Sequence, residues 1–181
     1  MVYNAYEQSR IPDDYWRLRI VDDSHRECGI AFGLDNYVYF TENSTDKIGR
    51  VDNVFGTYAE LALTAGTSPF HIVRGPDGNM WFTEFLASKI GRLNTSCFCL
   101  TGEFLTLTPN AYPVGITVGA DGALWFTESQ QDKIGRITTG GVVTEYRAQH
   151  TGTGMKDITS APDGSLWVTE PNNRQIGHFV Y

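Results

Sequence analysis

The chain has 181 residues, of which 41% are apolar and 19% charged, a composition typical of a globular domain with a sizeable core. Its formal net charge of −7 argues against a nucleic-acid partner or an anionic membrane surface, because both require a basic face. No apolar run approaches the ~20 residues that are needed to span a bilayer.

The chain begins with a polar leader, residues 1–14, which ends in the turn-forming segment Ile11–Asp14. Tyr15–Val21 follows and has the aromatic and β-branched content of a strand. No apolar signal-peptide core is visible at the N-terminus. The three cysteines are an odd number, and Cys97 and Cys99 lie too close together to outline a disulfide framework. We therefore expect free thiols and a cytoplasmic location, although a secreted protein whose signal peptide had been removed would have the same sequence.

One pattern then recurs four times between residue 33 and the C-terminus. The copies read GLDNYVYFTENSTDKIGRV, GPDGNMWFTEFLASKIGRL, GADGALWFTESQQDKIGRI and APDGSLWVTEPNNRQIGHF. The glutamate in each copy gives the series Glu42, Glu84, Glu128 and Glu170, which steps by 42, 44 and 42 residues. A period in this range is typical of a repeat array or a propeller. The repeats run over about 27–67, 68–110, 111–154 and 155–181.

Each complete repeat has room for four short strands. In repeat three we predict Val114–Val118, Ala123–Glu128, Lys133–Thr138 and Val142–Arg147. Asp-Gly pairs, and Asp35-Asn36 in repeat one, supply the positive φ angles that tight hairpins need. Four antiparallel strands in about 42 residues make one propeller blade.

The count of strands suggests how the array closes. Repeat four ends after its third strand, and Tyr15–Val21 is the strand that this blade lacks. We therefore predict an all-β protein, a β-propeller of four four-stranded antiparallel blades in a single domain over residues 15–181, with the N-terminal strand closing the last blade. Such pairing would hide an exposed sheet edge, within one chain or between two.

At this point the repeats carry a family likeness. Their shared elements are P-x-x-I, then DG-x-x-WFTE, then KIGR followed by an apolar residue. Repeat two has them at Pro69, Ile72, Asp77-Gly78, Trp81–Glu84 and Lys89–Leu93, and repeat three at Pro113, Ile116, Asp121-Gly122, Trp125–Glu128 and Lys133–Ile137. This pattern resembles the virginiamycin B lyase (streptogramin lyase) family over about residues 27–181.

The resemblance implies a seven-bladed propeller, a lyase that confers antibiotic resistance by opening a cyclic depsipeptide through elimination across its ester C–O bond. It further implies Mg²⁺, a histidine general base and glutamates near the metal. That chemistry is sensible, because the metal would stabilise the developing enolate while an imidazole removes the α-proton. Four repeats in place of seven leave three alternatives: a fragment, half of an assembly or a reduced propeller.

The family's catalytic histidine lies in a P-H-x-I arrangement at the rim that also carries the glutamates. The matching positions here are Cys28, Phe70, Val114 and Lys156, and none of them is histidine. His71 is the candidate base, but it lies one position later, which turns a strand residue to the opposite face.

The four glutamates are candidate ligands for a metal or for another ligand at the rim. They also occur in every repeat, and three face a lysine across the following hairpin, Lys47, Lys89 or Lys133, as in a structural cross-strand ion pair. Phe70, Tyr112 and Lys156 complete the candidate rim for an apolar or peptide-like ligand. The glycines that follow each K-I or Q-I pair should mark close backbone approach.

Two functions remain open from the sequence. One is a non-catalytic propeller that binds a small-molecule, peptide or protein ligand at this rim. The other is a Mg²⁺-dependent lyase that is completed by further blades or by a homodimer making a larger ring.

Overall fold

The computed structural model describes residues 27–54 and 56–181, and these residues form fifteen strands and no helix. Blade one contains β1 (Glu27–Phe32), β2 (Tyr37–Glu42), β3 (Lys47–Asp52) and β4 (Tyr58–Ala62). Blade two contains β5 (Pro69–Arg74), β6 (Met80–Glu84), β7 (Lys89–Asn94) and β8 (Cys99–Leu105). Blade three contains β9 (Pro113–Val118), β10 (Leu124–Glu128), β11 (Lys133–Ile137) and β12 (Val143–Arg147). Blade four contains β13 (Ile158–Ser160), β14 (Leu166–Glu170) and β15 (Gln175–Phe179).

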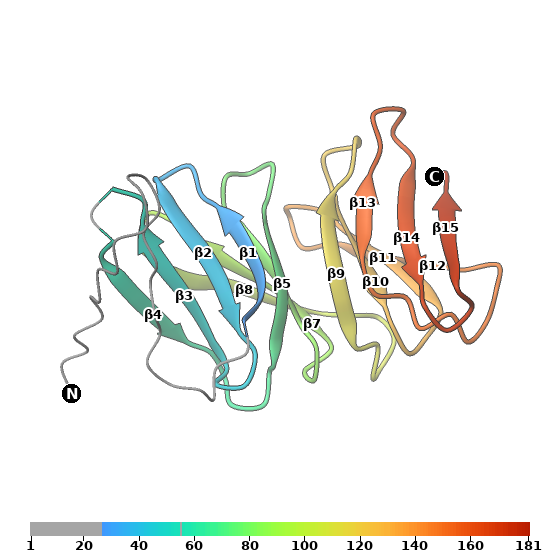
Figure 1. Cartoon of the computed structure of the whole chain (residues 1–181), viewed down its shortest axis with the longest axis horizontal. Coiled ribbons are helices and arrows are strands. Elements are labelled where there is room, and N and C mark those ends of the chain that lie inside the picture. Colours follow the sequence, from blue (N-terminus) through green and yellow to red (C-terminus); the bar gives the residue numbers. More distant parts are fainter. Residues whose placement is uncertain (1–26, 55) are drawn as a thin grey trace, which may run out of the picture.

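Each sheet pairs its strands in sequence order, and every pair is antiparallel. The four sheets follow one another from blade one at one end of the molecule to blade four at the other (Figure 1). The predicted all-β propeller architecture is therefore confirmed. Blade four has three strands among the described residues, and the expected closing strand Tyr15–Val21 lies outside them. No helix in the described part of the chain is long and apolar enough to cross a membrane.

The hairpin turns adopt the backbone that the sequence predicts. Gly78, Gly122 and Gly164 have φ angles of 78°, 72° and 88°, and Asn36 replaces glycine in blade one at 64°. These angles lie in the left-handed region, which glycine enters freely and asparagine tolerates. The Asp residue before the turn also fixes the tryptophan of the next strand, since Trp81 Nε1 donates to Asp77 Oδ1 at 3.0 Å.

The core consists of three layers, one at each junction between neighbouring blades. Blades one and two enclose Tyr39, Ile48, Ile72, Met80, Phe82 and Leu93. Blades two and three enclose Trp81, Ile90, Ile116, Leu124, Phe126 and Ile137. Blades three and four enclose Trp125, Ile134, Met155, Ile158, Leu166 and Val168. In blades two and three the tryptophan of the second strand faces the next blade, whereas the phenylalanine beside it faces the previous one, as the alternation of a strand requires.

A threonine hydroxyl also ties each blade to the next. Thr83 Oγ1 accepts from His71 N in its own blade at 3.0 Å and donates to Val114 O of blade three at 2.8 Å. Thr127 makes the same bridge, accepting from Gly115 N and donating to Lys156 O, both at 3.0 Å. Thr41 repeats it between blades one and two. The hydroxyl therefore satisfies buried main-chain groups on both sides of a junction.

The third-strand glycines of blades one to three leave room for an aromatic ring. A Cβ at Gly91 would lie 2.2 Å from the Phe82 ring, and one at Gly135 would lie 2.1 Å from the Phe126 ring. The expected close approach is therefore made by a side chain rather than by a backbone. The phenylalanine bends over the neighbouring strand of its own sheet, and a methyl group would displace it.

Replacing the bridging threonine by valine should destabilise the protein only at a closed junction. In Thr83→Val, His71 N and Val114 O lose the buried hydroxyl that they share, and we expect a loss of about 1–3 kcal/mol. The corresponding fall in melting temperature is about 2–4 °C per kcal/mol for a chain of this size.

Thr169→Val is the matched control, because Thr169 is exposed and bridges to no further blade among the described residues. Its effect should stay within about 0.5 kcal/mol. Equal losses in the two variants, measured by thermal and urea unfolding, would contradict the role of this hydroxyl as a bridge between blades.

Candidate functional site

The candidate site lies at the inner ends of blades two to four, where β5, β9 and β13 run side by side. The residue before the first-strand isoleucine is Gly29, His71, Gly115 or Asp157 in blades one to four. In blades one and three this position lies against the next blade, where a Cβ would come within 3 Å of main-chain atoms. His71 and Asp157 are thus the departures from a small residue in the repeat, and the structure brings them together.

His71 is partly exposed, with 31% of its side chain accessible, and its Nδ1 lies 4.0 Å from Asp157 Oδ1. The same nitrogen accepts a hydrogen bond from the main-chain N–H of Ile116 at 3.2 Å. A neutral imidazole in this position therefore carries its own proton on Nε2. In this state His71 presents a donor to a ligand, while the lone pair that a general base needs is occupied by the backbone.

Three aromatic side chains form the next part of the site. Phe85 lies between Phe70 and Tyr112, with ring centroids 6.0 Å and 5.1 Å away. All three are half-buried. The left-handed backbone at Tyr112, with φ 50°, repeats that of Ser68 at 53°, so the turn belongs to the blade whereas the aromatic side chain is particular to blade three. The rim residues Phe70 and Tyr112 therefore belong to one aromatic cluster.

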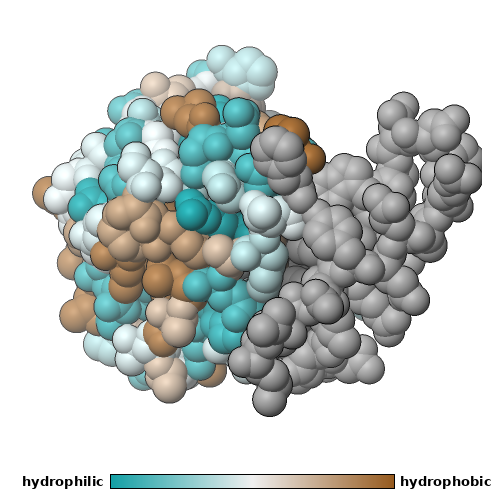
Figure 2. Space-filling model, turned by 90° about the vertical axis from the view of Figure 1, so that its left-hand side faces the viewer, coloured by the Kyte–Doolittle hydropathy of each residue, from teal (hydrophilic) through white to brown (hydrophobic). Residues whose placement is uncertain are grey.

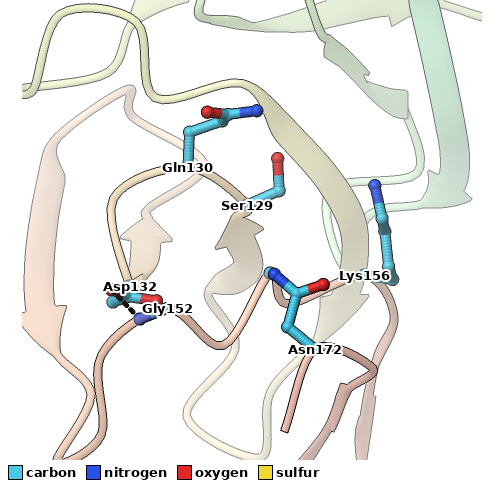
Figure 3. A pocket seen from close by; sticks show the side chains of 7 residues that line it. Ser129, Gln130, Asp132, Gly152, Lys156 and Asn172 are labelled. Atoms are coloured by element: carbon cyan, nitrogen blue, oxygen red, sulfur yellow. Dashed lines mark hydrogen bonds between the residues drawn. The ribbon is translucent and has the colours of Figure 1, made fainter.

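A polar pocket adjoins this cluster between blades three and four, with a volume of about 320 Å³. Its lining residues are Ser129, Gln130, Asp132, Gly152, Gly154, Lys156 and Asn172. Figure 3 shows Gln130, Lys156 and Asn172 around the opening, and the exposed Lys156 adds a positive charge. Lysine and amide donors beside aromatic rings suit a ligand that carries carbonyl or carboxylate oxygens together with apolar groups.

Two of the pocket residues hold the loops in place. Asp132 accepts from the main-chain N–H groups of Gly152 at 2.7 Å and Thr153 at 2.8 Å, and from the Thr153 hydroxyl at 2.7 Å. Burial alone would raise the pKa of Asp132, but these hydrogen bonds lower it overall. Ser129 Oγ donates to Tyr112 O at 2.9 Å, which attaches the pocket to the aromatic cluster. Of the polar side chains that line the pocket, Gln130, Lys156 and Asn172 are therefore the candidates for contact with a ligand.

The repeated glutamates lie beneath this rim rather than on its surface. Glu42, Glu84 and Glu128 are 0% exposed and Glu170 is 5% exposed. Glu84 and Glu128 do face Lys89 and Lys133 across the hairpin, as the sequence predicts. The lysines, however, pair with a glutamate of the fourth strand: Lys47 with Glu60 at 2.7 Å, Lys89 with Glu103 at 3.1 Å and Lys133 with Glu145 at 2.7 Å.

Two of these buried carboxyls hold a proton near neutral pH. Desolvation, followed by the charge of Glu145, raises the pKa of Glu128 to about 8. Desolvation and the neighbouring Glu103 likewise raise the pKa of Glu84 to about 8. Neither carboxyl has a hydrogen-bond donor as its partner. Once protonated, Glu128 can itself donate to Glu145, whose pKa the hydrogen bond from Lys133 helps to lower despite burial. Glu103 occupies the equivalent place beside Glu84.

In blade one, a tyrosine hydroxyl supplies the hydrogen-bond donor between the two neighbouring carboxyls. The Tyr58 hydroxyl lies 2.8 Å from Glu42 Oε1 and 2.5 Å from Glu60 Oε1. Burial and the hydrogen bonds to these two carboxylates raise the pKa of Tyr58, so the phenol stays protonated and supplies a donor. In blades one to three the repeated glutamate thus belongs to a structural group of one lysine and two carboxyls inside a blade.

The described residues do not provide a magnesium site. No three His, Cys, Asp or Glu side chains converge in residues 27–54 and 56–181 as metal ligands would. The buried glutamates are each surrounded by their own blade, and Asp132 is occupied by three donors. The residues present therefore do not fit the metal that the family resemblance implies, and we derive no step through it.

The expectation that Cys97 and Cys99 are free thiols was wrong. They form a disulfide across the turn that precedes β8, with their Cα atoms 5.2 Å apart. The intervening Phe98 has a φ of 48°, which folds the chain back and brings the two side chains together. A pairing between residues this close depends on that local turn, which the spacing alone does not reveal.

Phe85, Ser129, Gln130 and Asn172 were not expected as site residues. They follow the glutamate of their blade within a few positions, in a turn whose sequence differs from blade to blade: NSTD, FLAS, SQQD and PNNR. That variation beside constant neighbours is the signal that would have found them, because a binding site needs residues that the repeat does not dictate.

The buried carboxyls predict a pH dependence of stability. The folded protein holds a proton on Glu128 that the unfolded chain loses above its ordinary pKa of 4.5. The free energy of unfolding should therefore fall as the pH rises from about 4.5 to about 8, and level off above that. Glu128→Gln keeps the shape and the donor without the charge, so it should raise the melting temperature at pH 8 by several degrees and flatten this slope.

The matched control is Glu170→Gln, because β15 has no fourth-strand glutamate beside it among the described residues. It should leave the pH slope of the parent protein unchanged. A Glu128→Gln variant whose stability falls with pH as steeply as that of the parent would contradict the assignment of the buried proton.

Comparisons with known proteins agree with this architecture. The family model described as "Virginiamycin B lyase family" matches residues 14–180. Among solved structures, a catalytically inactive histidine-to-alanine variant of virginiamycin B lyase from Staphylococcus aureus with quinupristin is similar at 36% identity and a TM-score of 0.85. A selenomethionine-substituted form of the S. aureus enzyme is similar at 32% identity and a TM-score of 0.81. A streptogramin B lyase structure is similar at 34% identity and a TM-score of 0.80.

Each of these matches covers 90% of this chain but only 55%, 58% and 57% of the solved structures, so the chain spans a little over half of their length. A search of curated proteins found no match. The family model covers nearly the whole chain, and the structural matches exceed 30% identity over its four blades. The chain therefore belongs to the virginiamycin B lyase family.

Proposed function

We propose that this four-bladed unit is a ligand-binding module of the virginiamycin B lyase type that does not by itself catalyse elimination. The observation that carries the proposal is the hydrogen bond from Ile116 N to His71 Nδ1. It occupies the lone pair of the histidine nearest the family's catalytic position. The equivalent positions themselves hold Cys28, Phe70, Val114 and Lys156.

Elimination needs a base for the α-proton, and the other groups at this rim are poor replacements. Glu84 and Glu128 are fully buried within their blades, out of reach of a surface ligand. Asp157 is exposed, but a carboxylate is a much weaker base than imidazole near neutral pH. Positioned general-base catalysis is worth about 10²–10⁴-fold, so its loss should leave little turnover.

Ligand binding is better supported. The cluster of Phe70, Phe85 and Tyr112 offers apolar ring faces, and Lys156 with the adjoining amides offers donors. His71 adds a donor at Nε2. A cyclic peptide ester has aromatic or apolar side chains around a ring of carbonyls, which matches both halves of this surface. One of the similar structures was solved with quinupristin, so this compound is the appropriate probe.

The lyase itself is the second candidate. Membership of the family supports it, and so does a comparison of chain lengths. The similar virginiamycin B lyase structures are nearly twice as long as the part of them that matches this chain. A base and metal ligands would then come from blades outside this chain or from a second copy. In that arrangement the present rim would hold the substrate while the added residues removed its α-proton.

We predict that quinupristin incubated with the protein and Mg²⁺ remains cyclic, as measured by mass spectrometry. The base is missing at the family's position, and His71 Nδ1 is occupied. Turnover well above stoichiometric amounts that disappears in His71→Ala but persists in His150→Ala, an exposed histidine outside the site, would overturn the non-catalytic proposal.

A second prediction concerns the binding of quinupristin at this rim, measured separately from its turnover. Phe85→Ala and Lys156→Ala should each weaken quinupristin binding by about tenfold, because an aromatic contact or a hydrogen bond to a charged group is worth roughly 1–3 kcal/mol. Arg74→Ala is the control for loss of charge, since Arg74 is exposed at the opposite end of β5. Calorimetry that finds no binding, or equal loss in all three variants, would contradict this rim as the binding site.

A further inference from the structure

The junctions between blades use the same positions three times, and the two outermost faces of the molecule leave those positions open. The second-strand aromatic is 0% exposed as Tyr39, Trp81 and Trp125, but 41% exposed as Trp167 of blade four. The third-strand isoleucine is at most 3% exposed as Ile48, Ile90 and Ile134, but 63% exposed as Ile176. Blade four therefore presents a complete forward face that no other blade in residues 27–54 and 56–181 covers.

Blade one presents the complementary face. The first-strand isoleucine that receives the preceding blade is 1%, 1% and 4% exposed as Ile72, Ile116 and Ile158. Its counterpart Ile30 is 71% exposed, and Phe32 beside it on the same face is 46% exposed. Figure 2, which views the molecule from its blade-one end, shows an apolar area there among polar residues.

The polar part of the junction is also left open. Thr41, Thr83 and Thr127 bridge to a main-chain carbonyl of the next blade, at Phe70, Val114 and Lys156. Thr169 accepts from Asp157 N at 2.9 Å but is exposed. The carbonyl at the corresponding position of a following blade would belong to Cys28 of blade one.

The four described blades cannot close this junction on themselves. Blades one and four lie at opposite ends of the long axis, with blades two and three between them (Figure 1). The forward face and the receiving face are nevertheless both parts of one repeating interface. A second copy placed head to tail would cover the forward face of the first copy and offer its own forward face in return.

We propose that the forward face of blade four, centred on Trp167 and Ile176, docks on the receiving face of blade one, centred on Ile30, of a second copy of this chain. Two such contacts close a two-fold ring of about eight blades, which is within the range that propellers adopt. A head-to-tail interface whose rotation closes gives a ring, and otherwise it gives an open helix. This inference does not depend on the proposed ligand-binding role.

The histidine at the end of the repeat fits the same junction. Arg92 lies over the Trp81 ring, 5.5 Å from its centroid, and donates to Thr139 O of blade three at 3.0 Å. In blade four the equivalent residue is His178, which stacks on Trp167 with ring centroids 4.4 Å apart. A ring nitrogen of His178 would take the place of the arginine and meet the turn that follows β3 of the partner copy.

The test is the mass of the full chain in solution, measured by light scattering and sedimentation over a wide range of concentrations. We expect a dimer that dissociates on dilution. Trp167→Glu and Ile30→Glu should each weaken the dimer by more than about tenfold, because buried aromatic and aliphatic anchors dominate such interfaces. Leu105→Glu is the matched control, since Leu105 is 67% exposed but lies on the outer strand β8.

A mixing experiment separates a head-to-tail contact from a symmetric face-to-face one. In a dimer of either variant alone, both junctions contain a substituted face. The Trp167→Glu variant nevertheless retains an unaltered receiving face, and the Ile30→Glu variant retains an unaltered forward face. Their equimolar mixture should therefore form a heterodimer through one intact junction, detected by mass with one partner labelled. A monomer at all concentrations, a dimer insensitive to both substitutions, or growth into larger polymers would each overturn the two-copy ring. Far-ultraviolet circular dichroism confirms that both variants, changed at exposed positions, remain folded.

Discussion

The junction between neighbouring blades is the constraint on which the rest of the structure depends. A blade is a single sheet with large side chains on both faces, and a lone sheet cannot bury both. The second strand shows this most clearly, because Trp81 and Phe82 point in opposite directions and both are fully buried. Each blade therefore depends on neighbouring blades to cover its faces. The threonine that bridges the junction adds a directional contact to this packing and keeps the first strand of each blade in register with the second strand of its neighbour.

The strands and turns could be predicted from the sequence because their causes are local. In repeat three every predicted strand boundary lies within one residue of the observed one. The repeat period of 42–44 residues predicts the blades, and the alternation of side chains along a strand predicts which face each residue occupies. The Asp-Gly pairs predict the hairpin turns. What was missed depends on contacts between distant segments. Lys89 faces Glu84 in the hairpin, as expected, but reaches Glu103 on the fourth strand instead. Nothing near the lysine in the sequence reveals that competitor.

The candidate site could be predicted only in part, for a related reason. Phe70, His71, Tyr112 and Lys156 were found because they stand at a known place in the repeat. Phe85 was missed because the turn after the glutamate has no fixed pattern, although that freedom is what a site requires. The glutamates illustrate the opposite case. They look like a ring of ligands, yet all four are buried, and in blades one to three each lies beside a fourth-strand glutamate. In blades two and three the pair is reconciled by a raised pKa, and in blade one by the Tyr58 hydroxyl.

The position of the site relative to the open faces connects binding with assembly. The aromatic cluster and the pocket lie at blades two to four, on the rim that the second strands reach at Glu84 and Glu128. A closed ring would set the rim of a second copy opposite this one, so a ligand held at the centre would contact both. Any ligand that binds the ring better than the single chain must then strengthen the association by the same factor, because linkage is reciprocal. A peptide-like ligand of sufficient size would thus act on the junction between chains, although it touches neither Trp167 nor Ile30.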